Sequence, residues 1–169
     1  SNEWERMLRG HPDERFAQYM LSGLRGGFRI GFDYRRHGCT PSKSNMSSAL
    51  SNVAVVADYL QAESREGRLI GPLSKSQLMA PQVSPFGVIP KGSQPGKWRL
   101  ILDLSSPHGS SVNDGIEEKL CSLLYVSVDK IAGKILELGK GCEMAKLDVK
   151  SAYRIIPVHP DDRPLLGME

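Results

Sequence analysis

This chain of 169 residues has few cysteines, few aromatic residues and no long apolar run. Its three cysteines, Cys39, Cys121 and Cys142, lie far apart and form no Cys-x-x-Cys pair, which excludes a paired-cysteine metal site. We therefore expect reduced thiols in an intracellular protein, cytoplasmic or nuclear. No apolar run approaches the roughly 18 residues that a membrane span requires, so we expect no membrane partner.

The sequence also lacks the features of a natural translation start and of a signal peptide. It begins Ser-Asn-Glu-Trp-Glu-Arg, without an initiator methionine, a basic region or an apolar region. We interpret the chain as a segment of a longer protein. Its hydrophobic content of 40% excludes a disordered tail, and its length is that of one domain.

Acidic residues are absent between Glu66 and Asp103. The net charge of +3 is too small to imply a nucleic-acid partner by itself, so the distribution of charge is more informative. A cationic window followed by an acid-containing region suits a site that holds both an anion and a metal ion. The alternative is a solvated basic loop. The basic residues of the window are Arg68, Lys75, Lys91, Lys97 and Arg99.

Apolar residues at helical spacing predict three helices. The first runs from Asp13, a candidate N-cap, to about Leu24. The second runs from Ser48 to Glu66, and the third begins after Ser127, a second candidate cap. The expected inner faces are Leu50, Val53, Ala57 and Leu60 for the second helix, and Val128, Ile131, Ile135 and Leu138 for the third.

Shorter apolar runs bounded by turn residues predict strands. We expect residues 85–90 and 98–104 to form a β-hairpin whose tip, residues 91–97, is cationic and rich in glycine and proline. Two further strands are expected at residues 144–149 and 154–158. Strands mixed with helices without a regular alternation predict an α+β fold.

Two sequence patterns resemble known phosphate-binding or metal-binding sites but do not meet the requirements of those sites. The run from Gly92 to Lys97 resembles a phosphate-binding P-loop, but its glycines are spaced too closely and Trp98 stands where a serine or threonine is needed. Asp161 and Asp162 are preceded by a His-Pro pair and followed by an Arg-Pro pair. The two prolines predict a turn and not a metal-bearing hairpin.

The strongest constellation for chemistry is the run from Leu147 to Tyr153, in which Asp148 closes an apolar strand. A carboxylate at a strand end can hold Mg²⁺, and the turn after it presents backbone N–H groups to a triphosphate. Alone, this pattern more often marks a capped turn beside a packed tyrosine. The functional interpretation of this run is supported by Lys91 and Arg99, which flank the expected hairpin tip and have side chains suited to phosphate binding.

Three sequence blocks resemble consecutive blocks of retroelement reverse transcriptases. They are Ser-Pro-Phe-Gly-Val-Ile-Pro-Lys at 84–91, Lys-Trp-Arg-Leu-Ile-Leu-Asp at 97–103, and Leu-Asp-Val-Lys-Ser-Ala-Tyr-Arg-Ile-Ile-Pro at 147–157. The similarity covers about residues 48–169. Residues 102–116 make it closer to elements of the DIRS type than to gypsy-like ones.

The resemblance implies the fingers and an incomplete palm of a right-hand polymerase fold. Residues 1–47 would be an N-terminal extension and linker, and residues 48–106 the fingers, with a helix and a β-hairpin. Residues 107–169 would be the first part of the palm, returning toward the fingers at their C-terminal end.

The resemblance also implies roles for individual residues. Asp148 matches the first metal-binding aspartate, for Mg²⁺ or Mn²⁺, and Val149 the residue whose backbone carbonyl touches the metal. Lys91 and Arg99 match the pair that binds the phosphates of a dNTP. Ser151 and Ala152 match backbone donors to the same triphosphate, and Tyr153, at the sugar, matches the aromatic gate against a ribose 2′-hydroxyl. Trp98 is expected to anchor the hairpin.

One block of the family, the aromatic-x-Asp-Asp hairpin with the second metal-binding carboxylates, is missing from this sequence. We therefore expect a fragment of an RNA-directed DNA polymerase that is inactive alone, because two-metal catalysis needs both blocks. Its expected partners are template-primer nucleic acid, a dNTP and the remainder of the palm and thumb. The alternatives are a non-catalytic nucleic-acid or nucleotide-binding module derived from a polymerase remnant, and a partly folded fragment prone to self-association.

Overall fold

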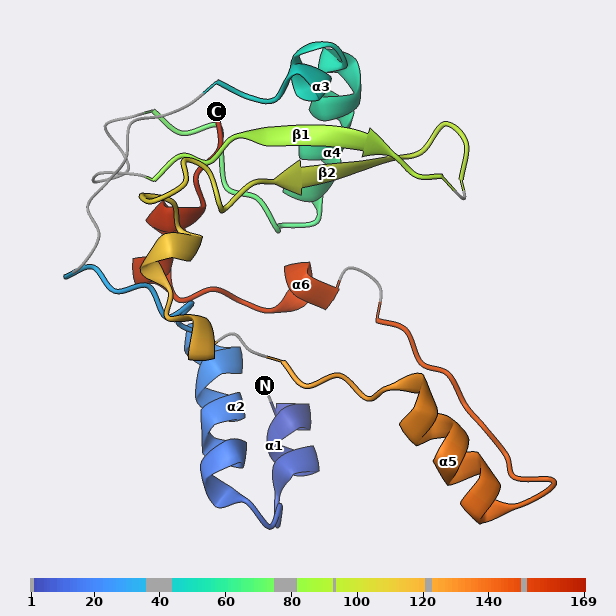
Figure 1. Ribbon diagram of the computed structural model, residues 1–169. Helices are drawn as coiled ribbons and strands as arrows, with labels where there is room; N and C mark the ends of the chain where they lie inside the picture. Colours follow the sequence, from blue (N-terminus) through green and yellow to red (C-terminus); the bar gives the residue numbers. More distant parts are fainter. Residues whose placement is uncertain (1, 36–43, 75–81, 93, 121–122, 150–151) are drawn as a thin grey trace.

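The computed structural model describes residues 2–35, 44–74, 82–92, 94–120, 123–149 and 152–169 (Figure 1). In these ranges, short helices accompany one two-stranded antiparallel sheet, which confirms the α+β class. None of the helices described is long and apolar enough to cross a membrane. Cys142 is a free thiol, and the other two cysteines lie outside the described residues.

Helices α1 (Asn2–Leu8) and α2 (Glu14–Gly26) form the N-terminal part of the chain. The predicted cap of α2 is confirmed, because the Asp13 carboxylate accepts a hydrogen bond of 2.9 Å from the Phe16 amide. The helix ends where Gly27 adopts a φ of +90°, a value that L side chains rarely take, and the Gly27 amide donates to the Gly23 carbonyl.

The predicted helix over residues 48–66 is two helices, α3 (Ser47–Leu50) and α4 (Val53–Arg65). Asn52 interrupts them with a φ of −132°, and its side-chain amide donates a hydrogen bond of 2.8 Å to the Ser48 carbonyl. An asparagine that bonds back to the preceding turn in this way competes with a continuous helix.

The predicted inner face of this region is wrong for three of its four residues. Leu50, Val53 and Ala57 are exposed, whereas Leu60 is partly buried against the core. The inward positions Ala49, Val56 and Leu60 share helical spacing, so the face that packs on the hairpin is displaced from the predicted one. The buried residues of these two helices are Ala49 and Val56.

The predicted hairpin is confirmed as strands β1 (Phe86–Pro90) and β2 (Trp98–Leu102). Its register places Val88 opposite Leu100 and Ile89 opposite Arg99. Because side chains alternate along a strand, one face of the hairpin packs on α3 and α4 and the other faces away from them. The buried residues of the core cluster on this packed face are Ala49, Val56, Phe86, Val88 and Leu100.

The outer edge of β1 is satisfied by the segment that leads into α3. The Met46 amide donates to the Phe86 carbonyl at 2.9 Å. In return, the Phe86 amide donates to the Asn45 side chain at 3.1 Å, and the Val88 amide to the Ser48 hydroxyl at 3.1 Å. These contacts replace hydrogen bonds that a third strand would make, so the outward-facing amides of Phe86 and Val88 both have acceptors.

Helix α5 (Val128–Leu138) begins at the predicted cap, where the Ser127 hydroxyl accepts from the Lys130 amide at 3.3 Å. The expectation that it buries an apolar face is wrong, because α5 has no buried residue and Ile131 is 50% exposed. In Figure 1 the helix projects away from the rest of the chain. No other described element packs against it. An apolar groove of about 460 Å³ lies between α5 and residues 142–144.

The two strands predicted near the C-terminal end do not form in the described residues. Residues 144–149 have no regular secondary structure, and Ala152–Ile155 is a one-turn helix, α6. A strand needs a hydrogen-bonded neighbour, and residues 144–149 have none among the described residues. Of the described residues in the two predicted strands, Val158 forms an isolated parallel bridge, with Phe28. The remaining elements are 3-10 helices: two single turns, Asn113–Gly115 and Glu118–Leu120, and a longer one, Pro160–Leu166.

Candidate functional site

The hairpin brings the predicted phosphate-binding residues together on its outward face. Ile89 lies directly opposite Arg99, and Lys91 is two residues beyond Ile89, so all three share one face. A polar pocket of about 270 Å³ lies here. We call it the hairpin pocket, and it is lined by Ile89, Pro90, Lys91, Gly92, Gln94 and Arg99.

Backbone hydrogen bonds fix the turn that carries this pocket. The Lys91 amide donates to the Lys97 carbonyl at 2.8 Å, and the Lys97 amide donates to the Gln94 carbonyl at 3.0 Å. The Gln94 amide donates back to the Lys91 carbonyl, also at 3.0 Å. Lys91 and Gln94 are therefore held on one side of the pocket while the rigid strand β2 presents Arg99 on the other.

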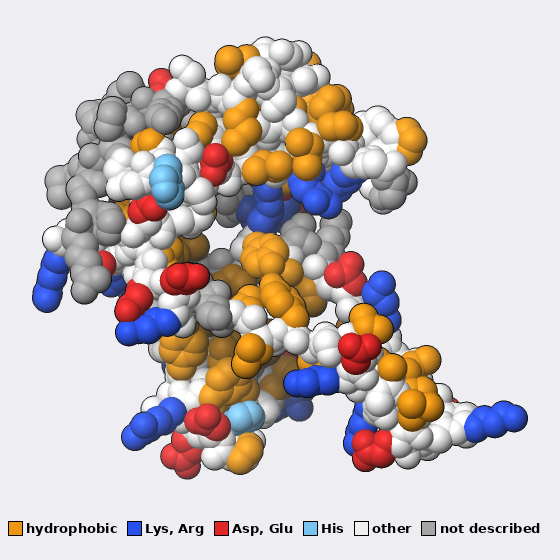
Figure 2. Space-filling model, in the orientation of Figure 1, with side chains coloured by type: hydrophobic (Ala, Val, Ile, Leu, Met, Phe, Trp, Pro, Cys, Tyr) orange, Lys and Arg blue, Asp and Glu red, His pale blue; other side chains and the backbone are white. Residues whose placement is uncertain are grey.

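The hairpin pocket is cationic because no described carboxylate neutralises it. No carboxylate lines the pocket, and neither Lys91 nor Arg99 takes part in an ion pair among the described residues. Figure 2 shows Lys and Arg side chains gathered beneath the hairpin, between it and the level of α6. A guanidinium and an ammonium that lack a protein partner attract an anion, and a phosphate group satisfies both.

Trp98 lies behind the pocket, on the inward face of β2. It is partly buried and packs against the core that Val88 and Leu100 form. Its place in the register, opposite Pro90, is at the start of the turn. The indole ring therefore joins the turn to the packed face of the hairpin.

The predicted metal-binding and sugar-binding residues lie apart from the hairpin pocket and do not line it. Asp148 and Val149 are exposed, in the irregular segment before α6. Ala152 and Tyr153 belong to α6, and the Tyr153 side chain is 92% exposed. Ser151 lies outside the described residues.

The described residues do not by themselves make up a catalytic metal site. Among them, no group of three or more His, Cys, Asp and Glu side chains is placed to hold a metal ion. Asp148 offers a single carboxylate, and two-metal chemistry needs carboxylates from more than one segment. Mg²⁺ or Mn²⁺ at Asp148 therefore stays a prediction.

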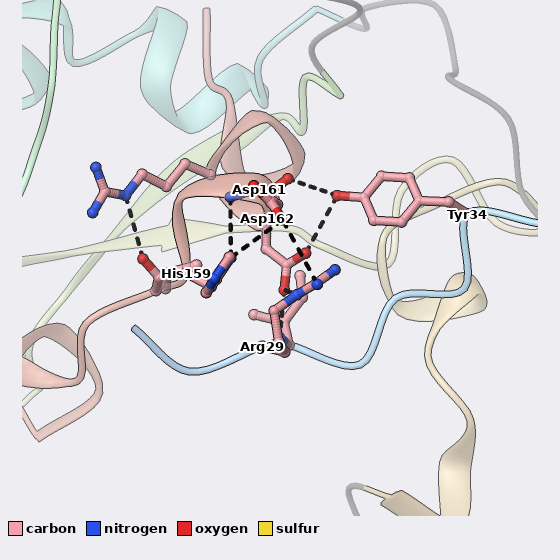
Figure 3. Close-up of polar contacts among 8 residues, drawn as sticks. Arg29, Tyr34, His159, Asp161 and Asp162 are labelled. Atoms are coloured by element: carbon pink, nitrogen blue, oxygen red, sulfur yellow. Dashed lines mark hydrogen bonds and ion pairs between the residues drawn. The ribbon is translucent and has the colours of Figure 1, made fainter. Parts of the chain in front are cut away.

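Asp162 is a buried acid among the described residues, and the sequence interpretation treated it only as part of a turn. Its carboxylate accepts hydrogen bonds from Arg29 Nε at 2.9 Å, from the Ile30 amide at 2.8 Å and from the Tyr34 hydroxyl at 3.3 Å (Figure 3). Burial by itself raises the pKa of Asp162, but these hydrogen bonds outweigh it and leave the pKa below its usual range. The Asp162 carboxylate thus binds three donors, and the pair Asp161-Asp162 lies in the 3-10 helix Pro160–Leu166.

Arg68, one of the basic residues of the acid-free window, is paired with acids that precede it in the sequence. Its guanidinium forms a forked pair with the Glu63 carboxylate, with Nε–Oε2 at 2.8 Å and Nη2–Oε1 at 3.2 Å. It also contacts Glu66 at 3.3 Å. Of the basic residues in the acid-free window, Arg68 is thus neutralised while Lys91 and Arg99 are not.

Comparisons of the chain with protein-family models, with curated proteins and with solved structures gave no match. The likeness to reverse transcriptases therefore rests on the three sequence blocks at 84–91, 97–103 and 147–157. The structural feature that bears on function independently of that likeness is the cationic hairpin pocket.

Proposed function

We propose that the hairpin pocket binds the phosphates of a nucleoside triphosphate, and that the chain is the fingers and first palm segment of a retroelement reverse transcriptase. The observation that carries the proposal is the pairing of Lys91 and Arg99 in one polar pocket without a carboxylate partner among the described residues. Forked hydrogen bonding from arginine and a mobile charge from lysine suit the β- and γ-phosphates.

In the proposed polymerase, this pocket would stabilise charge on the phosphates while a primer 3′-hydroxyl attacks a dNTP in line. Tyr153 would disfavour a ribonucleotide, because an added 2′-hydroxyl would meet its ring. Ser151 and Ala152 would donate backbone hydrogen bonds to the triphosphate, and Asp148 with the Val149 carbonyl would hold Mg²⁺ or Mn²⁺. Template contacts would be mainly to the nucleic-acid backbone and therefore salt-dependent.

The direct test is the affinity of the 169-residue chain for dATP, measured by equilibrium dialysis or fluorescence. Arg99→Ala and Lys91→Ala should each weaken binding about tenfold or more, because each removes a charge-assisted contact. Lys97→Ala is the matched control, since it removes a cation from the same tip without touching the pocket wall. Equal losses in all three variants would mean that only general positive charge matters.

A second test addresses catalysis in a chain extended through an aromatic-x-Asp-Asp block. There, Asp148→Asn should abolish primer extension, and undiminished activity would remove Asp148 from the mechanism. The 169 residues alone should not extend a primer.

The alternative is a module that binds nucleotide or nucleic acid without chemistry. It is favoured by the isolation of Asp148, which has no second carboxylate beside it among the described residues. Primer extension by the lengthened chain would rule this alternative out.

A further inference from the structure

The Glu63 carboxylate, near the C-terminal end of α4, lies between two guanidinium groups. Arg68 forms the forked pair with it, and Arg154 of α6 places Nη1 at 2.8 Å from Oε2. The Glu63 side chain is only 12% exposed. Charge-assisted contacts in such a partly desolvated place are stronger than pairs in open solvent.

Arg154 makes a second contact with α4. Its guanidinium carbon lies 4.9 Å from the ring centroid of Tyr59, which is one turn before Glu63 on the same face of the helix. Arg154 is therefore held by a carboxylate and an aromatic ring of one helix.

Apart from the backbone hydrogen bonds that Phe28 forms with Pro157 and His159 just after α6, the helix has few contacts that fix its position. It has no buried residue, and both Tyr153 and Ile155 are exposed. Within the described part of the chain, Arg154 is the α6 side chain that forms an ion pair or a ring contact with another element. The placement of α6 relative to α4 therefore depends on Arg154.

Helix α4 also supports the hairpin pocket. Val56 of α4 packs with Val88 and Leu100 in the core, on the face of the hairpin opposite Lys91 and Arg99. One helix thus carries the pocket at one end of the proposed nucleotide site and holds, through Glu63, the turn with Tyr153 at the other.

We infer that Glu63 is a positioning residue: by binding Arg154 it fixes α6 against α4, and so places the backbone that carries Tyr153 relative to the hairpin pocket. The inference rests on the proposed nucleotide-binding function. Arg68 orients the Glu63 carboxylate by its forked pair and leaves Oε2 shared with Arg154. The hydrogen bond from Arg68, opposed by burial and helped by Arg154, lowers the pKa of Glu63, so the carboxylate is charged at neutral pH.

The first experiment measures hydrogen–deuterium exchange of the amides of residues 152–156 in the 169-residue chain. Glu63→Gln and Arg154→Gln should each speed this exchange about tenfold, and the double variant should be no faster than either single one. Glu66→Gln is the matched control, because Glu66 contacts Arg68 but not Arg154, and it should leave the exchange unchanged. Unchanged exchange in both Glu63→Gln and Arg154→Gln would overturn the inference.

The second experiment compares the affinities for dATP, ATP and inorganic triphosphate. Glu63→Gln should reduce the preference for dATP over ATP severalfold while the affinity for triphosphate stays the same, a split that general destabilisation would not produce. Lys91→Ala should weaken all three probes together. Faster exchange with an unchanged dATP preference would also overturn the role of Glu63.

The two experiments distinguish a failure of the inference about Glu63 from a failure of the proposed nucleotide-binding function. If the unaltered chain binds none of the three probes, the proposed function fails, and with it the role of Glu63 in nucleotide selection. The exchange data still decide whether Glu63 places α6.

Discussion

Arg29 and Asp162 are joined by a hydrogen bond of 2.9 Å although 133 residues separate them in the sequence. Asp162 is fully buried, whereas the Arg29 side chain is about half exposed. Beside this pair, the Phe28 amide donates to the Pro157 carbonyl at 2.8 Å, and the His159 amide donates to the Phe28 carbonyl at 3.0 Å. The residues that follow α2 are therefore held against the residues that follow α6.

Removing the charge of Asp162 should destabilise the fold. In Asp162→Asn, the side chain can no longer accept charge-assisted bonds from both Arg29 and the Ile30 amide, and we expect a loss of about 2–3 kcal/mol in the free energy of unfolding. Urea denaturation measures this. Asp161→Asn is the control: Asp161 is 67% exposed and 3.8 Å from Arg29, so its change should stay below about 0.5 kcal/mol.

Stability should fall in acid. The pKa values of Asp162 and Glu63 are lower in the folded chain than in the unfolded one, so their contribution is full above the unfolded values, near pH 4, and is lost as the pH falls through the lower folded values. The loss of stability is measured as the decrease in the urea unfolding midpoint between pH 7 and pH 3. In Asp162→Asn the decline should be shallower, and an equally steep decline would show that other groups cause it.

Gly27 and Gly26 should respond oppositely to alanine. A Cβ at Gly27 would overlap the backbone of Val158 and His159, and the φ of +90° is strained for alanine, so Gly27→Ala should cost about 2 kcal/mol or more. A Cβ at Gly26 meets nothing within 4 Å, and Gly26→Ala should leave stability unchanged or raise it by up to about 1 kcal/mol. Thermal melting of the two variants distinguishes these outcomes.

The apolar side of α5 should affect association and not folding. Ile131 and Leu138 are exposed, so Ile131→Lys and Leu138→Lys should leave the melting temperature within about a degree while reducing concentration-dependent self-association. Analytical ultracentrifugation measures the association. Val88→Lys provides the contrast, because Val88 is buried in the core and its replacement should unfold the hairpin. A large drop in melting temperature on changing Ile131 would show that α5 is packed in solution.

Features that depend on neighbouring residues could be predicted from the sequence. The caps at Asp13 and Ser127 form as expected, because a cap requires only a side-chain oxygen a few residues from an amide. The hairpin also forms as expected, and its alternation places Lys91 and Arg99 on one face. The pocket is thus the part of the candidate site that the sequence could predict.

Features that depend on distant partners could not be predicted. Nothing near Asp162 indicates that it binds Arg29, and the two prolines around it explain the turn equally well without burial. The inner face predicted for residues 48–66 was wrong at Leu50, Val53 and Ala57, because packing on the distant hairpin decides which positions turn inward, and it buries Ala49 and Val56 instead. The strand predicted at residues 144–149 has suitable residues but no partner strand among the described ones.

The long separation between Arg29 and Asp162 has a consequence for the order of folding. The strands of the hairpin are joined by only seven residues, 91–97, so its core forms from local contacts, whereas the Arg29–Asp162 pair closes a loop of more than 130 residues at an entropic cost of about 4 kcal/mol. We expect the hairpin and its supporting helices to form early, and the junction of the two chain ends to form last. Under mild denaturation this junction should open first, and the cationic pocket should keep its shape after the N-terminal helices have detached.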